Sequence, residues 1–372
     1  MKILVVCSYY PPHLGGLEIV AQQHAERLAK RGHVVTVLTS MVDTAEVSGI
    51  VNGVSVVRLA TNNFFENRFG VPFPLFSFRF LGQAFREVRS VDVVHVHDVF
   101  YLSSFLAALA AHWYKKPLVL MQHVEIIAHP SRLVMFIQKV VFATTGAYIF
   151  KRSKKILTLN NRVDDFLLRR GILVDKIVAI ANGVDSEKFK PVFPLRKADL
   201  KKKFGLDTNK NAVLFVGRFV PKKGFEKLIA AKDSKYQIVF AGGQGPHESN
   251  SELIFLGKLS QDQLAEVYQA ADIFALPSEG EGFPLSVQEA MSAGLPIITT
   301  NDYGYGRYKF DTRNIILLDD LSPEHIKDII STLVSDNNRM MAMSEYSRQY
   351  ATTNFDWDVI ITSLEELYNK VV

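Results

Sequence analysis

The hydrophobic and polar residues in the first half of the chain alternate between two patterns. Residues 2–7 (KILVVC) and 34–39 (VVTVLT) are short apolar runs rich in β-branched residues, which is typical of buried strands. Between them, residues 17–32 repeat apolar side chains at helical spacing and end on Gly32. Strand-like runs recur at residues 54–59, 92–97, 117–123 and 155–160. Apolar strands separated by helices predict a parallel sheet that is covered by helices on both faces.

The pattern weakens near residues 177–197, where an Asn-Gly pair and two prolines interrupt it, and then begins again. A chain of 372 residues suits two domains of roughly 150 residues each. We predict two tandem, doubly wound α/β domains over residues 1–185 and 186–354, with a final helix over about 355–372 that packs back on the first domain. The second series of predicted elements lies at residues 211–219, 225–232, 236–243, 252–257, 262–271, 272–277 and 295–300, followed by a mostly helical region over 323–368.

Cysteine content and charge narrow the class of protein. The single cysteine, Cys7, excludes an internal disulfide bond and suits a reducing cytosol, and the N-terminal apolar run is too short for a signal peptide. Residues 1–180 contain 21 Lys and Arg against 12 Asp and Glu, whereas the rest of the chain has an acidic excess. The cations are scattered and form no recognisable nucleic-acid-binding motif. We therefore expect a cytoplasmic protein that binds no nucleic acid, with an anionic membrane surface or a phosphorylated acceptor as the partner of its basic half.

Two apolar segments of the basic half bear on membrane attachment. Residues 133–150 are long enough to span a bilayer, but a lysine near the centre, Lys139, costs roughly 2.5–3.5 kcal/mol on insertion scales. We expect a helix that lies against the protein core or on a membrane surface. Residues 64–80 contain seven phenylalanines, and four cations lie within residues 151–155. These features indicate either peripheral docking on the inner face of the cell membrane or a loop that covers the domain's own core.

Ligands of open α/β sheets bind at the carboxyl ends of the strands, so the loops that follow strands are candidates for chemistry. Residues 11–16 (PPHLGG) follow the first strand. Gly15 and Gly16 let the backbone approach a ligand, and the helix N-terminus behind them favours an anion. A Pro/Gly turn without any ligand is the alternative.

A second loop, residues 217–224 (GRFVPKKG), follows the first strand of the second domain. Arg218 and Lys223 bracket a turn there, so both cations can converge on one diphosphate without a metal. The alternative is a pair of solvated surface cations.

The third loop, residues 281–289 (EGFPLSVQE), begins and ends on a glutamate. Pro284 suits the first position of a helix, which places Glu281 in the loop and Glu289 more than a turn inside the helix. Carboxylates at different depths suit different hydroxyls of one elongated ligand, and the amides on either side of Pro284 can face it. The alternative is one glutamate that complements the helix dipole and one that is solvated.

A pair of histidines, His95 and His97, shares one face of a predicted strand and raises the question of a metal. Because no further Cys, His or Asp falls at ligand spacing, we predict no metal site there.

Four motifs in order resemble the retaining, nucleotide-sugar-dependent glycosyltransferases of family 4: PPHLGGLE, NGVD, VGRFVPKKG and PSEGEGFPLSVQEAMSAGLPIITT. The last contains that family's E-x7-E motif, and the resemblance covers nearly the whole chain. It implies the GT-B fold, with two Rossmann-like domains that face an interdomain cleft. It also implies metal-independent transfer of a sugar from a nucleoside-diphosphate sugar to a glycan or lipid-linked acceptor, with no cofactor.

The resemblance further implies roles for individual residues. Arg218 and Lys223 would bind the donor diphosphate, and Glu289 would hold the ribose hydroxyls. Glu281 and the amides after it would hold the donor sugar. His123 matches the histidine that points to the reacting sugar, although alone it would be an ordinary structural histidine. The implied catalytic group is His123, Glu281, Arg218 and Lys223, and the implied donor-binding group adds Gly15 and Gly16, which would close over the phosphates, with Gly282, Phe283, Pro284, Leu285 and Glu289.

The segment 301–314 departs from the family pattern, because it lacks the usual Gly-Gly…Pro-Glu loop and the later Asn-Gly. The donor is expected to be a UDP-sugar, with a GDP-sugar as the alternative. A non-catalytic GT-B protein that binds nucleotide-sugar or glycan, and a sugar phosphorylase, are the rival interpretations of the same motifs.

Overall fold

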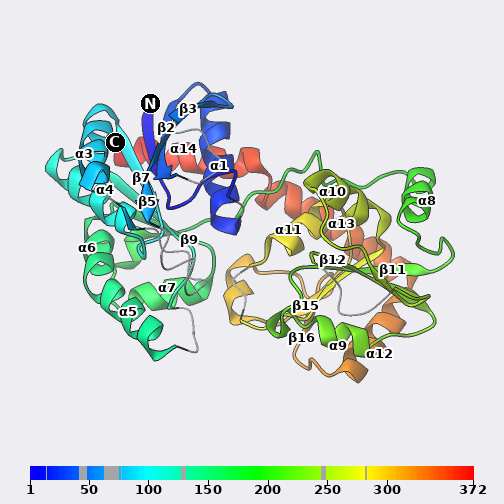
Figure 1. The fold of residues 1–372 in the computed structure, drawn as a ribbon. Helices are drawn as coiled ribbons and strands as arrows, with labels where there is room; N and C mark the ends of the chain where they lie inside the picture. Colours follow the sequence, from blue (N-terminus) through cyan, green and yellow to red (C-terminus); the bar gives the residue numbers. More distant parts are fainter. Residues whose placement is uncertain are drawn as a thin grey trace. The chain divides into compact units, whose positions relative to one another are not determined.

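The computed structural model describes residues 1–13, 15–41, 48–62, 75–76, 78–126, 131–243, 249–280 and 283–372. The chain forms two compact units, one of Met1–Ala181 with Ile361–Val372 and the other of Asn182–Ile360 (Figure 1). Each unit contains its own largely parallel sheet with helices, so the predicted class of two tandem α/β domains is confirmed. The division falls at 181/182 rather than at 185/186, because Val184 donates a backbone hydrogen bond to Phe355 and bridges Asp356 within the second unit.

The first unit is built on an eight-stranded sheet. Its strands are β1 (Lys2–Val6), β2 (Val34–Ser40), β3 (Ser48–Val51), β4 (Val54–Leu59), β7 (Val93–His97), β8 (Leu118–Gln122), β9 (Lys155–Thr158) and β10 (Ile177–Ala179). Their order is β10-β9-β8-β7-β1-β2-β4-β3, and only β3 is antiparallel to its neighbour. A separate antiparallel pair is formed by β5 (Thr61–Asn62) and β6 (Leu75–Phe76). The helices are α1 (Gly16–Lys30), α3 (Phe78–Ser90), α4 (Leu102–Trp113), α5 (Arg132–Ala143), α6 (Thr145–Arg152), α7 (Asn161–Leu168) and the 3-10 turn η1 (Val174–Lys176).

Side chains along the central strands alternate between the two faces of this sheet. Leu4 of β1 and Val94 and Val96 of β7 belong to the core cluster that also contains residues of α3, α4 and α6. The intervening residue His95 therefore points to the opposite face, where its ring contacts His24 of α1. This alternation places the histidines of β7 beneath α1, away from the main apolar cluster.

The last helix, α14 (Trp357–Val371), contributes its residues from Ile361 onward to the first unit. Glu365 accepts a hydrogen bond from Arg31 at 2.7 Å, and its other oxygen lies 2.8 Å from His33 Nε2. The Tyr368 hydroxyl lies 2.5 Å from His95 Nδ1. These contacts attach the C-terminal end of the chain to the face of the sheet that carries α1.

The second unit has a six-stranded, wholly parallel sheet. Its strands are β11 (Asn211–Val216), β12 (Tyr236–Ala241), β13 (Leu253–Phe255), β14 (Ile273–Leu276), β15 (Ile297–Thr300) and β16 (Ile316–Leu318). They lie in the order β13-β12-β11-β14-β15-β16, and every described pairing is parallel. The helices are α8 (Pro194–Lys203), α9 (Phe225–Ala230), α10 (Gln261–Ala270), α11 (Leu285–Ser292), α12 (Pro323–Val334) and α13 (Asn337–Asn354), with 3-10 turns η2 (Pro221–Lys223) and η3 (Tyr303–Tyr308).

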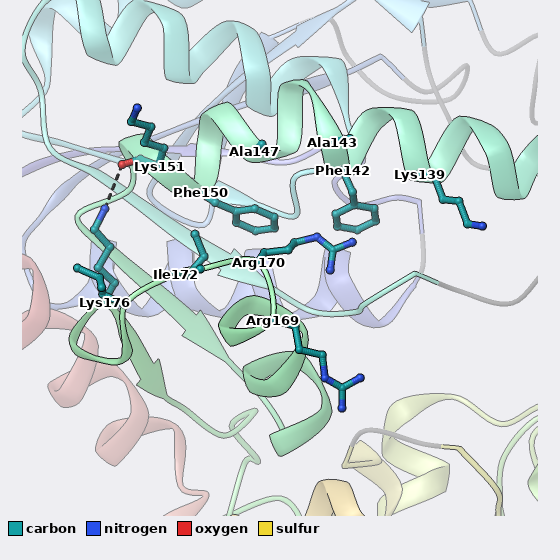
Figure 2. Close-up of a pocket in the computed structure, with 12 residues that line it drawn as sticks. Lys139, Phe142, Ala143, Ala147, Phe150, Lys151, Arg169, Arg170, Ile172 and Lys176 are labelled. Carbon is teal, nitrogen blue, oxygen red and sulfur yellow. Dashed lines mark hydrogen bonds between the residues drawn. The ribbon is translucent and has the colours of Figure 1, made fainter.

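The long apolar segment 133–150 folds as two helices, α5 and α6, which break at Thr144. The stretch Arg132–Arg152 is nevertheless long and apolar enough to cross a membrane by length and composition, and it is the one such stretch in the described part of the chain. Of an 18-residue segment within this stretch, 28% is buried, so most of it is exposed or partly exposed. Together with the turn after α7, these helices surround the hollow drawn in Figure 2.

Of the seven phenylalanines in residues 64–80, Phe80 is fully buried in the core of the first unit. The other six side chains fall outside the described residues. For those six, docking on a membrane and covering of the core both stay predictions.

Candidate functional site

The strand order of the second unit identifies the edge at which a ligand would bind. From β11 the chain passes to β12 and β13 on one side, and then to β14, β15 and β16 on the other. Such a reversal leaves a crevice outside the carboxyl ends of the two strands that flank it, here β11 and β14. Arg218 follows β11, and the segment from Pro277 to Leu285 follows β14.

The loop after β11 has a closely defined backbone. Val220 donates to the Arg218 carbonyl and Lys223 donates to the Val220 carbonyl, each at 2.9 Å. Gly224 adopts a left-handed φ of 72°, and a Cβ there would lie 2.1 Å from the Pro277 carbonyl oxygen, so this position requires glycine. The packing of Gly224 on Pro277 brings the loops after β11 and β14 together.

Two further contacts fix the position of the same loop. Glu279, after β14, donates from its backbone to the Lys222 carbonyl at 2.8 Å. Gly242, after β12, has a φ of 128°, and a Cβ there would lie 2.3 Å from the Gly217 carbonyl oxygen. Arg218 itself is exposed, and it has no ion-pair partner among the residues that the structure describes. The predicted cations thus lie on a supported loop, with the Arg218 charge open to a ligand.

Glu289 lies on α11 and is held by a residue that sequence patterns did not identify. The Tyr268 hydroxyl, on α10, donates to the Glu289 carboxylate at 2.9 Å. Burial raises the pKa of Glu289 to about 7, although the hydrogen bond from Tyr268 acts in the opposite direction. The Glu289 carboxylate is therefore oriented, and its ionisation is sensitive to a ligand near neutral pH.

The turn before α11 is held by aromatic packing. The Phe283 ring is buried, and its centroid lies 4.2 Å from that of Tyr308, 5.3 Å from that of Tyr305 and 5.6 Å from that of Phe310. All three partners come from residues 301–314, the segment that departs from the family pattern. This segment therefore supports the turn into α11 by packing, a role that its sequence did not indicate.

The placement of the remaining donor-site residues differs in part from the prediction. Pro284 was predicted at the first position of the helix, but it is the N-cap of α11, and Leu285 begins the helix. The Leu285 amide belongs to the first turn, whose N–H groups have no acceptor within the helix. Glu281 and Gly282 lie outside the described residues, so their roles stay predictions.

In the first unit, Gly15 is the N-cap of α1 and Gly16 is its first residue, after the carboxyl end of β1. A Cβ on Gly15 would lie 2.2 Å from Glu18 Oε2, whereas a Cβ on Gly16 would meet nothing within 4 Å. Glu18 Oε1 lies 3.2 Å from His13 Nδ1. A carboxylate thus already occupies the N-terminus of α1, where the helix dipole favours an anion, and it would have to move if position 15 carried a side chain. Over Gly16 the backbone stays open to a ligand.

His123 follows β8 at the same sheet edge. Its Nε2 lies 3.2 Å from Nδ1 of His97, and burial lowers the pKa of His123 to about 4. The imidazole is therefore neutral at pH 7. Behind it, Gln122 donates to the Asp98 carboxylate at 2.8 Å and to the Val124 carbonyl at 2.7 Å, which ties the end of β7 to the turn that carries His123.

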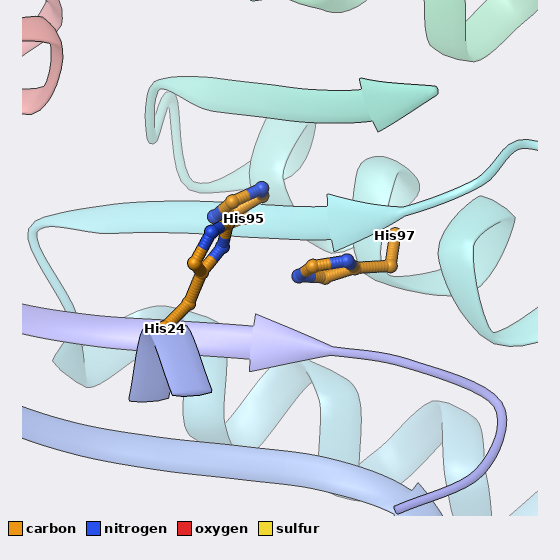
Figure 3. Close-up of side chains that lie close together, drawn as sticks. All are labelled: His24, His95 and His97. Carbon is orange, nitrogen blue, oxygen red and sulfur yellow. The ribbon is translucent and has the colours of Figure 1, made fainter. Parts of the chain in front are cut away.

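The neighbouring histidines form a buried cluster (Figure 3). One ligand nitrogen from each of His24 on α1 and His95 and His97 on β7 lies within 4.8 Å of the others. Burial lowers the pKa of His24 to about 3 and holds those of His95 and His97 well below the usual range. Neutral imidazoles are the form that ligates metal ions, so these three side chains could hold a divalent cation. We expected no third ligand near His95 and His97. This expectation is wrong, because the fold places His24 of α1 beside them.

Both units match known glycosyltransferase families. The family described as Glycosyltransferase Family 4 matches residues 14–188, and the one described as Glycosyl transferases group 1 matches residues 196–350. An uncharacterized glycosyltransferase of Methanocaldococcus jannaschii is 26% identical, with 100% of this chain and 99% of that protein covered. A D-inositol 3-phosphate glycosyltransferase of Xylanimonas cellulosilytica is 25% identical over 95% of this chain and 91% of that protein.

The fold is shared with HepE of Anabaena, which was solved in complex with UDP-glucose. The two structures align with a TM-score of 0.76 over 100% of both chains, at 17% sequence identity. The two family matches together cover most of both units, and they agree with the motifs and with the paired parallel sheets. The chain therefore belongs to glycosyltransferase family 4 and has the GT-B fold.

Proposed function

We propose that the protein transfers a sugar from a nucleoside-diphosphate sugar to an acceptor hydroxyl, with retention of anomeric configuration and without a metal. The observation that carries the proposal is the arrangement after β11 and β14 in the second unit. Arg218 and Lys223 lie on a loop of fixed backbone, and Glu289 lies on the helix that follows β14. Cations suit the diphosphate, and an oriented carboxylate suits ribose hydroxyls, so this edge offers a partner to each half of a nucleoside diphosphate.

The proposed reaction exchanges one bond at the anomeric carbon for another on the same face of the sugar. The bond to the diphosphate oxygen breaks, the bond to the acceptor oxygen forms, and the acceptor proton passes to an oxygen of the departing diphosphate. Arg218 and Lys223 stabilise the negative charge that develops on this leaving group. His123, neutral because burial lowers its pKa to about 4, is suited to a hydrogen bond with the sugar rather than to a charge interaction.

For the donor we propose a UDP-sugar, with a GDP-sugar as the alternative. HepE of Anabaena has been solved with UDP, with UDP-glucose, and with UDP and glucose. The shared fold supports a uridine nucleotide as the first choice to test.

For the acceptor we propose a hydroxyl of a lipid-linked glycan, used in the biosynthesis of a cell-surface polysaccharide or glycolipid. The support lies in the first unit, where α5 exposes apolar side chains within a region rich in cations. The protein would then be cytoplasmic and peripheral to the inner face of the membrane.

The test is a donor screen in two steps. Thermal shifts with UDP, GDP, ADP and their sugar conjugates identify the nucleotide, and release of that nucleoside diphosphate is then measured with and without acceptors. We expect slow hydrolysis of one donor without acceptor and faster release with an acceptor glycan. Binding without any turnover, even on lipid-linked acceptors, would favour a non-catalytic binding protein, and release of inorganic phosphate would favour a phosphorylase.

A further inference from the structure

A hollow of about 790 Å³ lies in the first unit between α5, α6 and the turn after α7 (Figure 2). The rings of Phe142 and Phe150 project into it from the two helices, 6.4 Å apart between centroids and nearly parallel, with Ile172 facing them. Five cations surround this apolar floor, and none of the described residues that line the hollow is acidic. The five are Lys139, Lys151, Arg169, Arg170 and Lys176.

The hollow is separate from the candidate site of the same unit. Lys151 precedes β9, and the turn at residues 169–173 precedes β10, so these residues lie toward the amino ends of those strands. His123 follows β8 at the carboxyl ends. A ligand in the hollow therefore occupies a different end of the sheet from the one at which GT-B chemistry is proposed.

Two of these cations, Arg170 and Lys176, are held in place by contacts of their side chains. The Arg170 guanidinium carbon lies 3.6 Å from the centroid of the Phe166 ring and 5.7 Å from that of Phe142. Lys176 Nζ donates to the Lys151 carbonyl at 3.0 Å. Burial lowers the pKa of Arg170, and the charge of Glu125 opposes that shift. Positioning of this kind is expected of a binding site more than of solvated surface cations.

Helix dipoles explain only part of the arrangement. Lys151 lies in the last turn of α6, and Arg169 follows the last residue of α7, and both are places where a helix C-terminus favours a cation. That effect does not account for an apolar floor beneath the cations. The helix dipoles also do not account for the local excess of positive charge, since residues 131–176 contain ten Lys and Arg against three Asp.

An exposed apolar row lies beside the hollow on α5. Leu133 and Phe136 are each 64% exposed and Val140 is 42% exposed. At about 100° per residue, the three fall within roughly 60° of one another on the helix, and Lys139 lies next to Phe136 on the side of the hollow. Apolar side chains next to cations on one helix face are typical of a helix that lies in a membrane interface.

We propose that this hollow binds the headgroup phosphate of an anionic phospholipid in a bilayer, while Leu133, Phe136 and Val140 enter the interface beside it. The cations match the phosphate, and the exposed apolar side chain of Leu173, which also lines the hollow, matches the carbon atoms next to it. A soluble anion would account for the cations but not for the exposed row. The inference deepens the proposed membrane attachment by naming the site that makes it, and it does not depend on donor chemistry.

The test measures binding of the full chain to vesicles of phosphatidylcholine alone and of equal parts phosphatidylcholine and phosphatidylglycerol. We expect binding to the anionic vesicles only, reduced about tenfold or more in Lys139→Glu/Arg169→Glu, since each cation near an anionic surface contributes about 1 kcal/mol. The matched control is Arg86→Glu/Arg89→Glu on α3, which changes net charge equally at exposed positions of the same unit. An equal loss in both double variants would show that net charge, not the hollow, binds the membrane, and would overturn the proposal.

Two neutral substitutions sharpen the result. Ala147→Trp fills the hollow from an exposed helix position without changing charge, and Phe136→Ser shortens the apolar row. Both should weaken vesicle binding. If neither does, and soluble glycerol phosphate shifts the melting temperature of the protein, the hollow is a site for a soluble anion and the proposal fails. Donor hydrolysis is measured in the wild type and in every variant. If the wild type hydrolyses no donor, the proposed function is contradicted, whereas the vesicle binding still tests the membrane site independently.

Discussion

Glu289 has a charge state that depends on its surroundings. Burial raises its pKa to about 7, so near neutral pH the unliganded protein contains both ionised and neutral forms. Tyr268 donates a hydrogen bond that favours the ionised form. A ribose hydroxyl would do the same, because an ionised carboxylate accepts hydrogen bonds more strongly than a neutral one. Nucleotide binding and ionisation of Glu289 are therefore linked.

We predict that the affinity for the cognate nucleoside diphosphate rises from about pH 6 to about pH 8 by roughly three- to tenfold, and that Glu289→Gln binds more weakly and shows less of this rise. Titration calorimetry at several pH values measures both. Ionisation of the nucleotide changes the affinity with pH equally for both proteins. The decisive quantity is therefore the difference between the wild type and Glu289→Gln in how steeply the affinity rises with pH. Parallel slopes would mean that Glu289 is not the group that titrates.

The stability of the unliganded protein is expected to change with pH in the opposite direction, because it falls as the pH rises. A carboxyl whose folded pKa is about 7 against an ordinary 4.5 contributes stability at low pH, and this stability is lost as the pH rises through the window from 4.5 to about 7. The loss is of the order of 1–3 kcal/mol, and Glu289→Gln should be free of it. Chemical denaturation of both proteins at the two ends of the window provides the control for the binding experiment.

Gly15 and Gly16 are neighbours in the chain, but a side chain would meet different surroundings at the two positions. Gly15→Ala would displace the Glu18 carboxylate from the N-terminus of α1, so we predict a loss of about 0.3–1 kcal/mol of stability. Gly16→Ala meets open space in the first turn of α1 and should leave the stability unchanged or slightly higher. If the ligand approaches over Gly16, the second variant loses kcat/KM despite its stability. Equal melting temperatures for the two variants would contradict the role given to Glu18.

The position of candidate residues within one continuous motif was predictable from sequence, and the residues that contact them from elsewhere were not. Arg218 and Lys223 lie in the loop after β11, as their place in the motif indicated, and their convergence on a diphosphate stays a prediction. Tyr268 reaches Glu289 from α10, and His24 reaches His95 from α1. Each sits on an amphipathic helix, where a buried tyrosine or histidine looks like any other core residue until the packing is known.

Among the elements, the turn into α11 depends on a neighbouring segment for its shape. Phe283 precedes α11 and packs on Tyr305, Tyr308 and Phe310, from the segment that contains η3. The Tyr350 hydroxyl, on α13, donates to the Tyr308 carbonyl at 2.5 Å. Aromatic packing and a hydrogen bond thus connect the donor-side turn to α13.

We predict that Tyr308→Ala loses roughly 1–3 kcal/mol of stability and raises the KM for the donor, because the turn before α11 loses its closest ring contact. Tyr303→Ala, in the same 3-10 turn but 58% exposed, is the matched control and should change neither. Denaturation curves and donor kinetics for both variants decide the matter. A donor KM unchanged in Tyr308→Ala would mean that the packing is structural only.

The central strands were predicted well, whereas of the edge strands only β13 was predicted, and β3, β10 and β16 were not. Strands such as β1, β7 and β11 are buried on both faces of a parallel sheet and read as continuous apolar runs. At the sheet edges, β3 and β10 are partly exposed, and only three or four residues long, so they lack that signal. The break between α5 and α6 at Thr144 was missed for a related reason, because the apolar pattern continues across it.

At the scale of the whole molecule, the two units carry different chemistry. The second unit supplies exposed positive charge through Arg218 at the carboxyl end of β11. The first unit supplies the buried cluster of His24, His95 and His97, and all three imidazoles are neutral at pH 7. A cation held by this cluster would be enclosed by α1 and β7, and its function would be to stabilise the first unit.

We predict that transfer activity survives prolonged treatment with EDTA, because Arg218 and Lys223 supply the charge that a metal would otherwise bring to the diphosphate. Activity, metal content and melting temperature are measured on the same treated sample. Loss of activity that magnesium or manganese restores, with an unchanged melting temperature, would overturn the role given to the two cations. A lower melting temperature that zinc restores in the wild type but not in His95→Ala would instead identify the histidine cluster as a structural metal site. The two outcomes are separable because the cations proposed to act on the donor and the ligands that could hold a metal belong to different units.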